Sequence, residues 1–355
     1  MEKKLFINKK SFGGRNVALV TGGLGFIGRA LIQRLLENPD VHVINLDVVT
    51  YAAAPELLDL GENESRYTFI QGSVTDDILV QYIIDTAKPH YVFHMAAESH
   101  NSNAAASSKC FWETNATGSA VVYSCIWRAV EAGYMPKKIV HMATCEVYGD
   151  KPIESTDMFV ETDSLNPNTS YNNSKASGDR EAQIFAKRGL PVVIARPSNI
   201  FGPGQDPEKV IPAFIRRVLH GEKIPVYDSY TNYREWTYLS DAVDALIFLA
   251  DSAAPGIYNI TSYEKRNVME IAQKILLCAG LSNKAHEYIS IVKARPEHDR
   301  GYPLNAAKIN AFGWKPKYTF EQGFEETFKW NKDNIDWLDK RIALGRIDEF
   351  SWGKK

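Results

Sequence analysis

The chain has 355 residues, enough for one large domain or two domains of moderate size. Hydrophobic residues make up 45% and charged residues 24% of the sequence, which is typical of folded globular proteins and argues against disorder. The formal net charge is −2, which excludes a nucleic-acid-binding polycation, and every apolar run is shorter than the roughly 18 residues that a membrane span needs. We therefore expect a soluble protein with no nucleic-acid or membrane partner.

The cysteines and the N-terminus indicate a cytoplasmic protein without a metal. The four cysteines are scattered and show no paired C-x-x-C spacing, so we expect neither a zinc site nor a disulfide framework: they are Cys110, Cys125, Cys145 and Cys278. Residues 1–14 are rich in lysine but lack the apolar core and the cleavage site of a signal peptide.

Short apolar runs alternate with longer amphipathic ones over the first 200 residues. Six of these runs predict strands, at 16–20, 41–46, 67–71, 91–95, 138–143 and 192–196. Residues 26–38 predict a helix with Ile27, Leu31 and Leu35 on one face, ended by Pro39. Strands that alternate with helices in this way predict an α/β fold with a Rossmann-type, doubly wound parallel sheet.

The sequence changes in character after Arg196, where prolines separate shorter elements. Residues 236–260 read as a strand, a helix and a second strand that return to the main sheet. We therefore expect a Rossmann domain and a smaller C-terminal α/β lobe, flanked by two tails. The domain would comprise 14–196 and 236–262, the lobe 197–235 and 263–340, and the tails 1–13 and 341–355.

A glycine-rich turn follows the first predicted strand. In TGGLGFIG, the glycines Gly22, Gly25 and Gly28 precede a helix, so the backbone can approach a pyrophosphate and the helix N-terminus can bind it. Asp47 ends the second strand, where its carboxylate can bond a ribose diol and repel a 2′-phosphate. A glycine turn that binds nothing is the alternative, but the strand before it and the helix after it favour a site for NAD rather than NADP.

A second pattern predicts acid–base chemistry. Tyr171 and Lys175 lie one helical turn apart, so that the ammonium can stabilise a phenolate that takes a proton from a hydroxyl. Thr144, Cys145 and Glu146 follow the strand at 138–143 and are expected at the same sheet edge as Tyr171. By itself the Tyr-x-x-x-Lys spacing is also compatible with a surface tyrosine and a solvated lysine.

Several motifs together resemble the extended short-chain dehydrogenase/reductase family. The N-terminal ones are TGGLGFIG, HMAAESH (94–100), TNATGS (114–119), ATCEVYG (143–149) and YNNSK (171–175). The C-terminal ones resemble nucleoside-diphosphate-sugar 4,6-dehydratases, above all dTDP-glucose 4,6-dehydratases: 199–212, 225–236, 258–260 and 294–305. The resemblance extends from about Val17 to Trp314.

The resemblance implies an NAD-dependent cycle on a nucleoside-diphosphate sugar. Tyr171 would deprotonate the C4 hydroxyl while hydride passes to NAD, and Thr144 would hydrogen-bond the same oxygen. Glu146 would then remove the C5 proton, water would leave from C6, and hydride would return to C6. The product would be a 4-keto-6-deoxy sugar.

The resemblance also implies two sets of binding residues and a homodimer. The cofactor would meet Gly22, Gly25, Phe26, Ile27, Gly28, Asp47, Ser73, Val74, Ala96, Ala97, Tyr171 and Lys175. The substrate would meet Ser99, Asn199, Lys209, Val210, Pro225, Tyr227, Arg234, Asn267, Arg295 and His298. The dimer interface would use the helical patterns at 114–132 and 171–188.

Two residues depart from the family's pattern. Cys145 stands where the family has the aspartic acid expected to protonate the departing C6 hydroxyl, and Ser73 replaces an aspartate that usually meets the adenine. A thiol is a weaker acid by roughly 4–5 pKa units. Either Cys145 or Glu146 acts as the acid, or the enzyme is a 5,6-dehydratase that returns hydride to C4, or the chain is a slow, degenerate paralogue.

Two further alternatives remain, one a related enzyme and the other a protein without catalytic activity. A 4-epimerase or decarboxylase of nucleoside-diphosphate sugars would share Tyr171 and Lys175, but the C-terminal motifs count against it. A non-catalytic nucleotide-binding protein is the other alternative, against which the intact Tyr-x-x-x-Lys pair argues.

Overall fold

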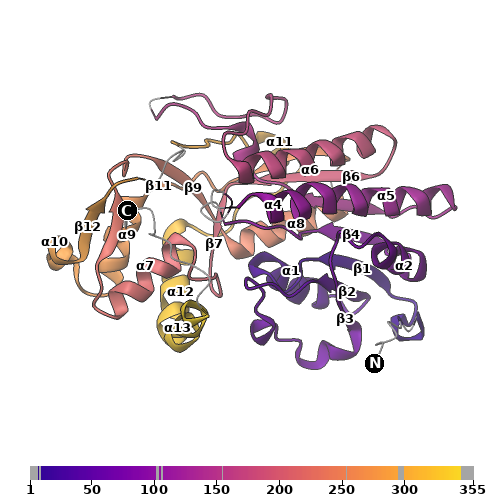
Figure 1. Cartoon of the computed structure of the whole chain (residues 1–355), viewed down its shortest axis with the longest axis horizontal. Helices are drawn as coiled ribbons and strands as arrows, with labels where there is room; N and C mark the ends of the chain where they lie inside the picture. Colours follow the sequence, from indigo (N-terminus) through magenta and orange to yellow (C-terminus); the bar gives the residue numbers. More distant parts are fainter. Residues whose placement is uncertain are drawn as a thin grey trace. The chain divides into compact units, whose positions relative to one another are not determined.

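The computed structural model describes residues 7, 9–100, 104, 107–153, 155–252, 254–294 and 300–344 of the chain (Figure 1). The chain divides into two compact units. The first unit comprises Met1–Val147, Thr169–Arg196 and Val243–Tyr258. The second comprises Tyr148–Asn168, Pro197–Ala242 and Asn259–Lys355. No helix in the described ranges is both long enough and apolar enough to cross a membrane.

A seven-stranded sheet is the centre of the Rossmann fold, with the strand order β10-β6-β5-β4-β1-β2-β3. The pairs from β6 across to β3 are all parallel. The strands are β1 (Asn16–Thr21), β2 (Val41–Asp47), β3 (Tyr67–Gln71), β4 (Tyr91–His94), β5 (Lys138–Met142), β6 (Val192–Pro197) and β10 (Gly256–Ile260). The six predicted strands and the doubly wound parallel sheet are thus confirmed. The chain reverses direction across the sheet between β1 and β4, where such folds bind ligands.

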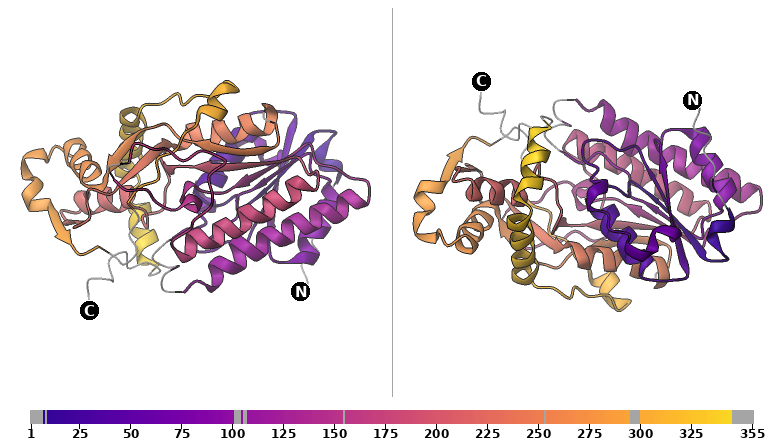
Figure 2. Two further views of the ribbon diagram at one scale, coloured as in Figure 1. Left: turned by 90° about the horizontal axis from the view of Figure 1, so that it is seen from above. Right: turned by 90° about the horizontal axis from the view of Figure 1, so that it is seen from below.

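Helices cover both faces of this sheet. They are α1 (Phe26–Leu36), α2 (Asp77–Ala87), α4 (Lys109–Phe111), the π-helix η4 (Trp112–Thr117), α5 (Gly118–Glu131), α6 (Ser170–Lys187) and α8 (Leu239–Ser252). α5 packs against α2 and α6, and Figure 2 shows α5 and α6 side by side. On α1 and α8, Arg34 and Asp244 form an ion pair. Val17 and Leu19 share a core with α2, α5 and α6, and Ala18 between them is also buried, as a sheet covered on both faces requires.

The predicted apolar face of α1 was wrong by about one residue. The buried positions are Gly28, Arg29, Leu31, Ile32 and Leu36, whereas Ile27 and Leu35 are only partly buried. A Cβ atom at Gly28 would lie 2.3 Å from the Gly22 carbonyl oxygen. The helix therefore turns its glycine side toward the preceding turn, and this contact rotates the apolar face.

The predicted N-terminal tail, 1–13, is partly wrong. Ile7 and Phe12 belong to the core of the first unit, and Lys9–Phe12 form a short 3₁₀ helix, η1. The Ile7 N–H donates to the Tyr82 hydroxyl at 3.3 Å, and the Phe12 ring centroid lies 4.8 Å from that of His42. Two apolar side chains in a lysine-rich segment are sufficient to attach it to the sheet.

The second unit contains two small sheets. β11 (Lys265–Asn267), β9 (Tyr233–Tyr238) and β7 (Asn199–Phe201) form one, and β12 (Ile289–Val292) pairs in parallel with β8 (Ile224–Tyr227) in the other. The helices are α7 (Val210–Leu219), α9 (Val268–Cys278), α10 (Ala285–Tyr288), α11 (Ala307–Ala311), α12 (Phe320–Asp333) and α13 (Ile335–Ala343). Their core contains several aromatic residues, including Phe201, Phe214, Phe320 and Phe324.

Three segments differ from the expected organisation. The strand at Trp236 does not return to the main sheet but pairs with Asn199 of β7, whereas β10 does return. Residues 148–168, expected with the Rossmann domain, belong to the second unit, where the Phe159 carbonyl accepts a 3.0 Å bond from the Asn259 side chain. The expected tail at 341–355 begins inside α13, where Arg341 Nε donates to Asp206 at 2.8 Å.

Candidate active site

The glycine turn after β1 is too crowded for side chains at three positions, Gly22, Gly23 and Gly28. Gly22 has a φ of +70°, and a Cβ atom there would lie 2.6 Å from Cα of Ala96, which follows β4. A Cβ atom at Gly28 would meet the Gly22 carbonyl oxygen at 2.3 Å. Gly25, in contrast, is close only to that same oxygen, at 3.3 Å. The turn therefore brings the two loops together at the β1–β4 crossover and leaves the Gly25 face open.

The N-terminus of α1 is arranged to bind an anion. Gly25 occupies the N-cap position and has no side chain to accept a hydrogen bond. Within the described residues, the N–H groups of Phe26, Ile27 and Gly28 have no acceptor. Free N–H groups at the positive end of a helix dipole suit a pyrophosphate. These residues therefore fit a dinucleotide.

Asp47 is held beside this turn at the carboxyl end of β2. Its Oδ2 accepts the Leu24 N–H at 2.9 Å, and its Oδ1 accepts the Val49 N–H at 2.7 Å. Val49 has a φ of +60°, a rare conformation for a β-branched residue. Each carboxylate oxygen keeps a second lone pair with which it can accept a ribose hydroxyl. Asn45, which sequence reasoning missed, accepts the Gly23 N–H at 3.0 Å.

Other residues expected around the cofactor follow the ends of β3 and β4: Ser73, Val74, Ala96 and Ala97. The Ser73 oxygen accepts the Thr75 N–H at 3.1 Å, so its hydroxyl helps to form the local turn. The Ala96 N–H donates to Thr21 at 3.2 Å, which attaches this loop to β1. Ala97 is exposed, whereas Val74 is buried.

The structure brings four predicted catalytic side chains together. Thr144 follows β5, Cys145 and Glu146 begin the short 3₁₀ helix η5 (Cys145–Tyr148), and Tyr171 lies in the first turn of α6. All four are at least nine-tenths buried. The Thr144 hydroxyl accepts the Glu146 N–H at 3.3 Å, and the Glu146 carboxylate lies close enough to Tyr171 to raise the pKa of its phenol. Lys175, one turn further along α6, donates to the Met142 carbonyl at 2.6 Å.

Burial shifts the pKa values of Tyr171 and Lys175 in opposite directions. Burial raises the pKa of Tyr171 above its usual value, and the charge of Glu146 raises it further. Burial lowers the pKa of Lys175 to about 8, which Asp179 opposes. At neutral pH Lys175 therefore carries a proton, and the phenol keeps its own until positive charge stabilises the phenolate.

A buried ion pair that sequence reasoning missed supports the lysine. Arg196, at the end of β6, donates to both carboxylate oxygens of Asp179, at 2.8 and 2.9 Å. Both side chains are almost completely buried. Asp179 lies four residues after Lys175 on α6, so the i, i+4 spacing would have been the signal in the sequence.

A hydrogen-bonded network around His94 and Asn115 was also missed. His94 joins Thr21 of β1, at 2.9 Å, to Ser119 of α5, at 3.0 Å. Burial and Lys175 lower the pKa of His94 to about 3, so the ring stays neutral. Asn115, in η4, donates to Ser174 at 2.9 Å. The motifs at 94–100 and 114–119 contain His94 and Asn115, but nothing in their spacing predicts these partners.

The second unit contains most of the expected substrate residues. The side-chain oxygen of Asn199 is buried and has no hydrogen-bond partner among the described residues, so it is available to accept one from a ligand. Lys209 occupies the N-cap position of α7, without a side-chain capping bond, and forms a 3.1 Å ion pair with Glu208. The Arg234 guanidinium lies 5.0 Å from the Tyr302 ring centroid.

Other expected substrate residues have structural positions of their own. The Asn267 oxygen accepts the Glu270 N–H at 2.9 Å in a capping box, so that oxygen already stabilises α9. Val210 begins α7, Pro225 and Tyr227 lie in β8, and Ser99 is an exposed residue of the first unit. Arg295 and His298 lie outside the described residues. No three acidic, histidine or cysteine side chains in the described ranges are grouped to hold a metal ion.

Comparison with known proteins agrees with this geometry. Residues 18–261 match the model of the NAD dependent epimerase/dehydratase family. The dTDP-glucose 4,6-dehydratase 1 of Escherichia coli K12 is 35% identical over 340 residues, which are 90% of this chain and 94% of that protein. The crystal structure of the dTDP-glucose 4,6-dehydratase DesIV from Streptomyces venezuelae, with NAD bound, has a TM-score of 0.84 and 33% identity, covering 92% of this chain and 99% of that one.

An epimerase is similar in fold but less similar in sequence. The UDP-glucose 4-epimerase of Thermotoga maritima has a TM-score of 0.80 and 25% identity, with 90% of this chain and 99% of that chain covered. The chain therefore belongs to the NAD dependent epimerase/dehydratase family and, within it, to the nucleoside-diphosphate-sugar 4,6-dehydratases.

Proposed function

We propose that this protein converts dTDP-glucose, or a closely related UDP-sugar, into its 4-keto-6-deoxy product with NAD as cofactor. The observation that carries the proposal is the buried group of Tyr171, Thr144 and Glu146 at the carboxyl edge of the sheet that also bears the glycine turn. Oxidation at C4 requires a base that takes the proton of the hydroxyl, which Tyr171 can supply. Proton removal at C5 requires a second base, which the Glu146 carboxylate can supply.

The first unit would hold NAD. The N–H groups of Phe26, Ile27 and Gly28 would bind the pyrophosphate, and Asp47 would accept the ribose hydroxyls. When bound, NAD would supply a positively charged nicotinamide ring that can accept hydride and return it. Because Tyr171 is buried beside negative charge, a nearby positive charge is what its phenolate form needs.

Each catalytic side chain would then have a separate proton to move or hold. Tyr171 would take the proton of the C4 hydroxyl, and Thr144 would donate a hydrogen bond to the same oxygen. Lys175 would stabilise the phenolate from a position fixed by the Met142 carbonyl and the Asp179 carboxylate. Glu146 would remove the C5 proton that the 4-ketone makes acidic.

Cys145 would donate the proton with which the C6 hydroxyl leaves as water. Its side chain is buried, and it directly precedes Glu146 in η5 at the carboxyl edge of the sheet. A 5,6-dehydratase that returns hydride to C4 is the second candidate. Both candidates would lose the C6 hydroxyl as water and differ only in whether hydride returns to C6 or to C4. The observation that raises the second candidate is that Cys145 stands where the family has an aspartic acid.

The second unit would hold the nucleoside diphosphate. Arg234 and Asn199 would bind the diphosphate, while Lys209, Val210 and the stretch from Pro225 to Tyr227 would lie by the base. Guanidinium groups bond phosphate oxygens in pairs, and the Asn199 amide offers a further polar contact. Ser99, Asn267, Arg295 and His298 would complete the substrate site.

We further propose a homodimer in the cytoplasm. α5 and α6 lie side by side (Figure 2), and Ile184 of α6 is 44% exposed, as a helix pair that packs against its copy would require. All four cysteines are free thiols, which suits a reducing compartment.

Cofactor preference depends on Asp47. We expect the parent protein to bind NAD at least tenfold more tightly than NADP, and Asp47→Asn to reduce that preference, because the charge that repels a 2′-phosphate is removed. Isothermal titration calorimetry measures both affinities. Asp40→Asn, at the other end of β2, has the same charge change on an exposed side chain and should alter neither affinity. Equal affinities in the parent protein would contradict the proposal.

The oligomeric state depends on the α5–α6 surface. Light scattering at micromolar concentration should give about 80 kDa, twice the chain mass of 39.9 kDa. Ile184→Arg should give the monomer mass, whereas Ile78→Arg, on the 82% exposed Ile78 of α2, should leave the dimer intact. A parent particle of 40 kDa would exclude the proposed interface.

Cys145 separates the two elimination mechanisms. Cys145→Ala should leave C4 oxidation intact, visible as transient absorbance near 340 nm, but slow water loss on the order of 10²–10⁴-fold, because acid assistance is lost. Cys145→Asp should restore or raise the rate of dehydration. Rapid-quench mass spectrometry follows the loss of 18 Da.

The control for this experiment is Cys125→Ala, which removes another buried thiol, in α5. It should turn over like the parent. If Cys145→Ala also turns over like the parent, the thiol has no acid role, and Glu146 or water must supply the proton. An unsaturated parent product without a 4-ketone would identify the 5,6-dehydratase.

A further inference from the structure

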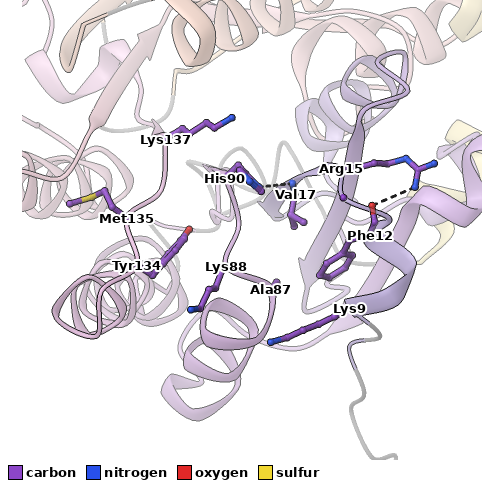
Figure 3. Close-up of a pocket in the computed structure, with 11 residues that line it drawn as sticks. Lys9, Phe12, Arg15, Val17, Ala87, Lys88, His90, Tyr134, Met135 and Lys137 are labelled. Carbon is purple, nitrogen blue, oxygen red and sulfur yellow. Dashed lines mark hydrogen bonds between the residues drawn. The ribbon is translucent and has the colours of Figure 1, made fainter.

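A hollow lies at the amino edge of the seven-stranded sheet, whereas the candidate catalytic residues follow the carboxyl ends of its strands (Figure 3). Its wall includes Val17 of β1, together with His90 and Lys137, which directly precede β4 and β5. The volume is about 500 Å³, within the range of small-molecule sites. β1 is six residues long and connects this hollow to the glycine turn, so roughly 15–20 Å separates the two.

The wall of the hollow is positively charged. Four of its residues carry a permanent cation, Lys9, Arg15, Lys88 and Lys137, and none of its residues is acidic. In the described part of the chain, none of these four cations forms an ion pair. The chain as a whole has a net charge of −2, so this cluster is not a consequence of a basic composition. Uncompensated cations in a concave wall attract anions.

Among the described residues, these cations donate hydrogen bonds only to neutral groups, so their positive charge is not neutralised. Arg15 Nε donates to the Pro39 carbonyl at 3.0 Å, and Lys137 Nζ donates to the Asn16 side chain at 3.1 Å. Both acceptors are neutral. The ammonium groups of Lys9 and Lys88 make no hydrogen bond within the described residues, and both side chains line the same hollow.

His90 adds a neutral donor. Its Nδ1 accepts the Val17 N–H at 3.0 Å, so the neutral ring carries its proton on Nε2. Burial and the charge of Lys137 lower the pKa of His90, which keeps the ring in this neutral form. The wall thus combines cations with a fixed N–H donor.

Apolar and aromatic side chains form the remainder of the wall. Phe12, Ala87, Tyr134 and Met135 line it, and Met135 is 52% exposed. The Tyr134 hydroxyl donates to the Pro89 carbonyl, which fixes the ring in place. A simple inorganic ion would use the cations but not this surface.

We propose that the hollow binds a phosphate-bearing small molecule that also has an aromatic or other apolar group, at a site separate from the active site. The phosphates would contact Lys9, Lys88 and Lys137, and the apolar group would pack against Phe12 and Tyr134. The ligand class is that of nucleotides and similar phosphorylated metabolites.

Calorimetry on the full-length protein saturated with NAD tests this site. ATP serves as the probe with an aromatic group, and inorganic tripolyphosphate as the probe without one. We expect saturable ATP binding, with tripolyphosphate weaker, because it lacks the ring. Lys9→Gln/Lys88→Gln should weaken ATP binding at least tenfold, as expected when two phosphate contacts are lost. Unchanged thermal unfolding and NAD affinity would establish that this variant is folded.

The matched control is Lys284→Gln/Lys332→Gln, which removes two exposed lysines of the second unit. It should change ATP affinity by less than twofold. Absence of ATP binding would overturn the proposal. An equal loss of affinity in the two double variants would also overturn it, because ATP would then respond to the total positive charge of the protein and not to this hollow. Equal affinity for ATP and tripolyphosphate would overturn its aromatic part.

Discussion

The buried positive charge of Lys175 is the interaction on which the candidate active site depends. An ammonium removed from water is costly unless it is paired, and burial here lowers its pKa to about 8. The Met142 carbonyl accepts its hydrogen bond, and Asp179 supplies opposite charge while it is itself paired with Arg196. His94 stays neutral close to this charge. The surroundings thus preserve one cation one helical turn from a buried phenol, where a phenolate must form.

Much of the fold could be predicted, because the strands are apolar on both faces and the turn residues are distinctive. The errors came from contacts that no local pattern contains. The buried face of α1 is set by the close approach of Gly28 to Gly22. The strand β9 pairs with β7 rather than with the main sheet. Arg341 reaches back 135 residues to Asp206, so a segment that was expected to be a tail belongs to the second unit.

The candidate site was predictable where its residues form motifs. Gly22, Tyr171 and Lys175 stand at spacings that chemistry imposes, and the structure places the side chains of Thr144 and Glu146 near Tyr171. The supporting residues could not be found in this way. His94 hydrogen-bonds Thr21, which lies 73 residues away in the sequence, and Asn115 hydrogen-bonds Ser174, which lies 59 residues away. Such pairs exist only once the strands and helices are assembled.

The central claim is that hydride leaves C4 and returns to C6 of one sugar while the side chains of Tyr171 and Glu146 move the protons. The most direct test uses dTDP-glucose with deuterium at C4 and locates the label in the product by NMR and mass spectrometry. We expect deuterium at C6 of a 4-keto-6-deoxy sugar, retained within the same molecule. Deuterium found again at C4 of an unsaturated product, or lost to solvent, would contradict it.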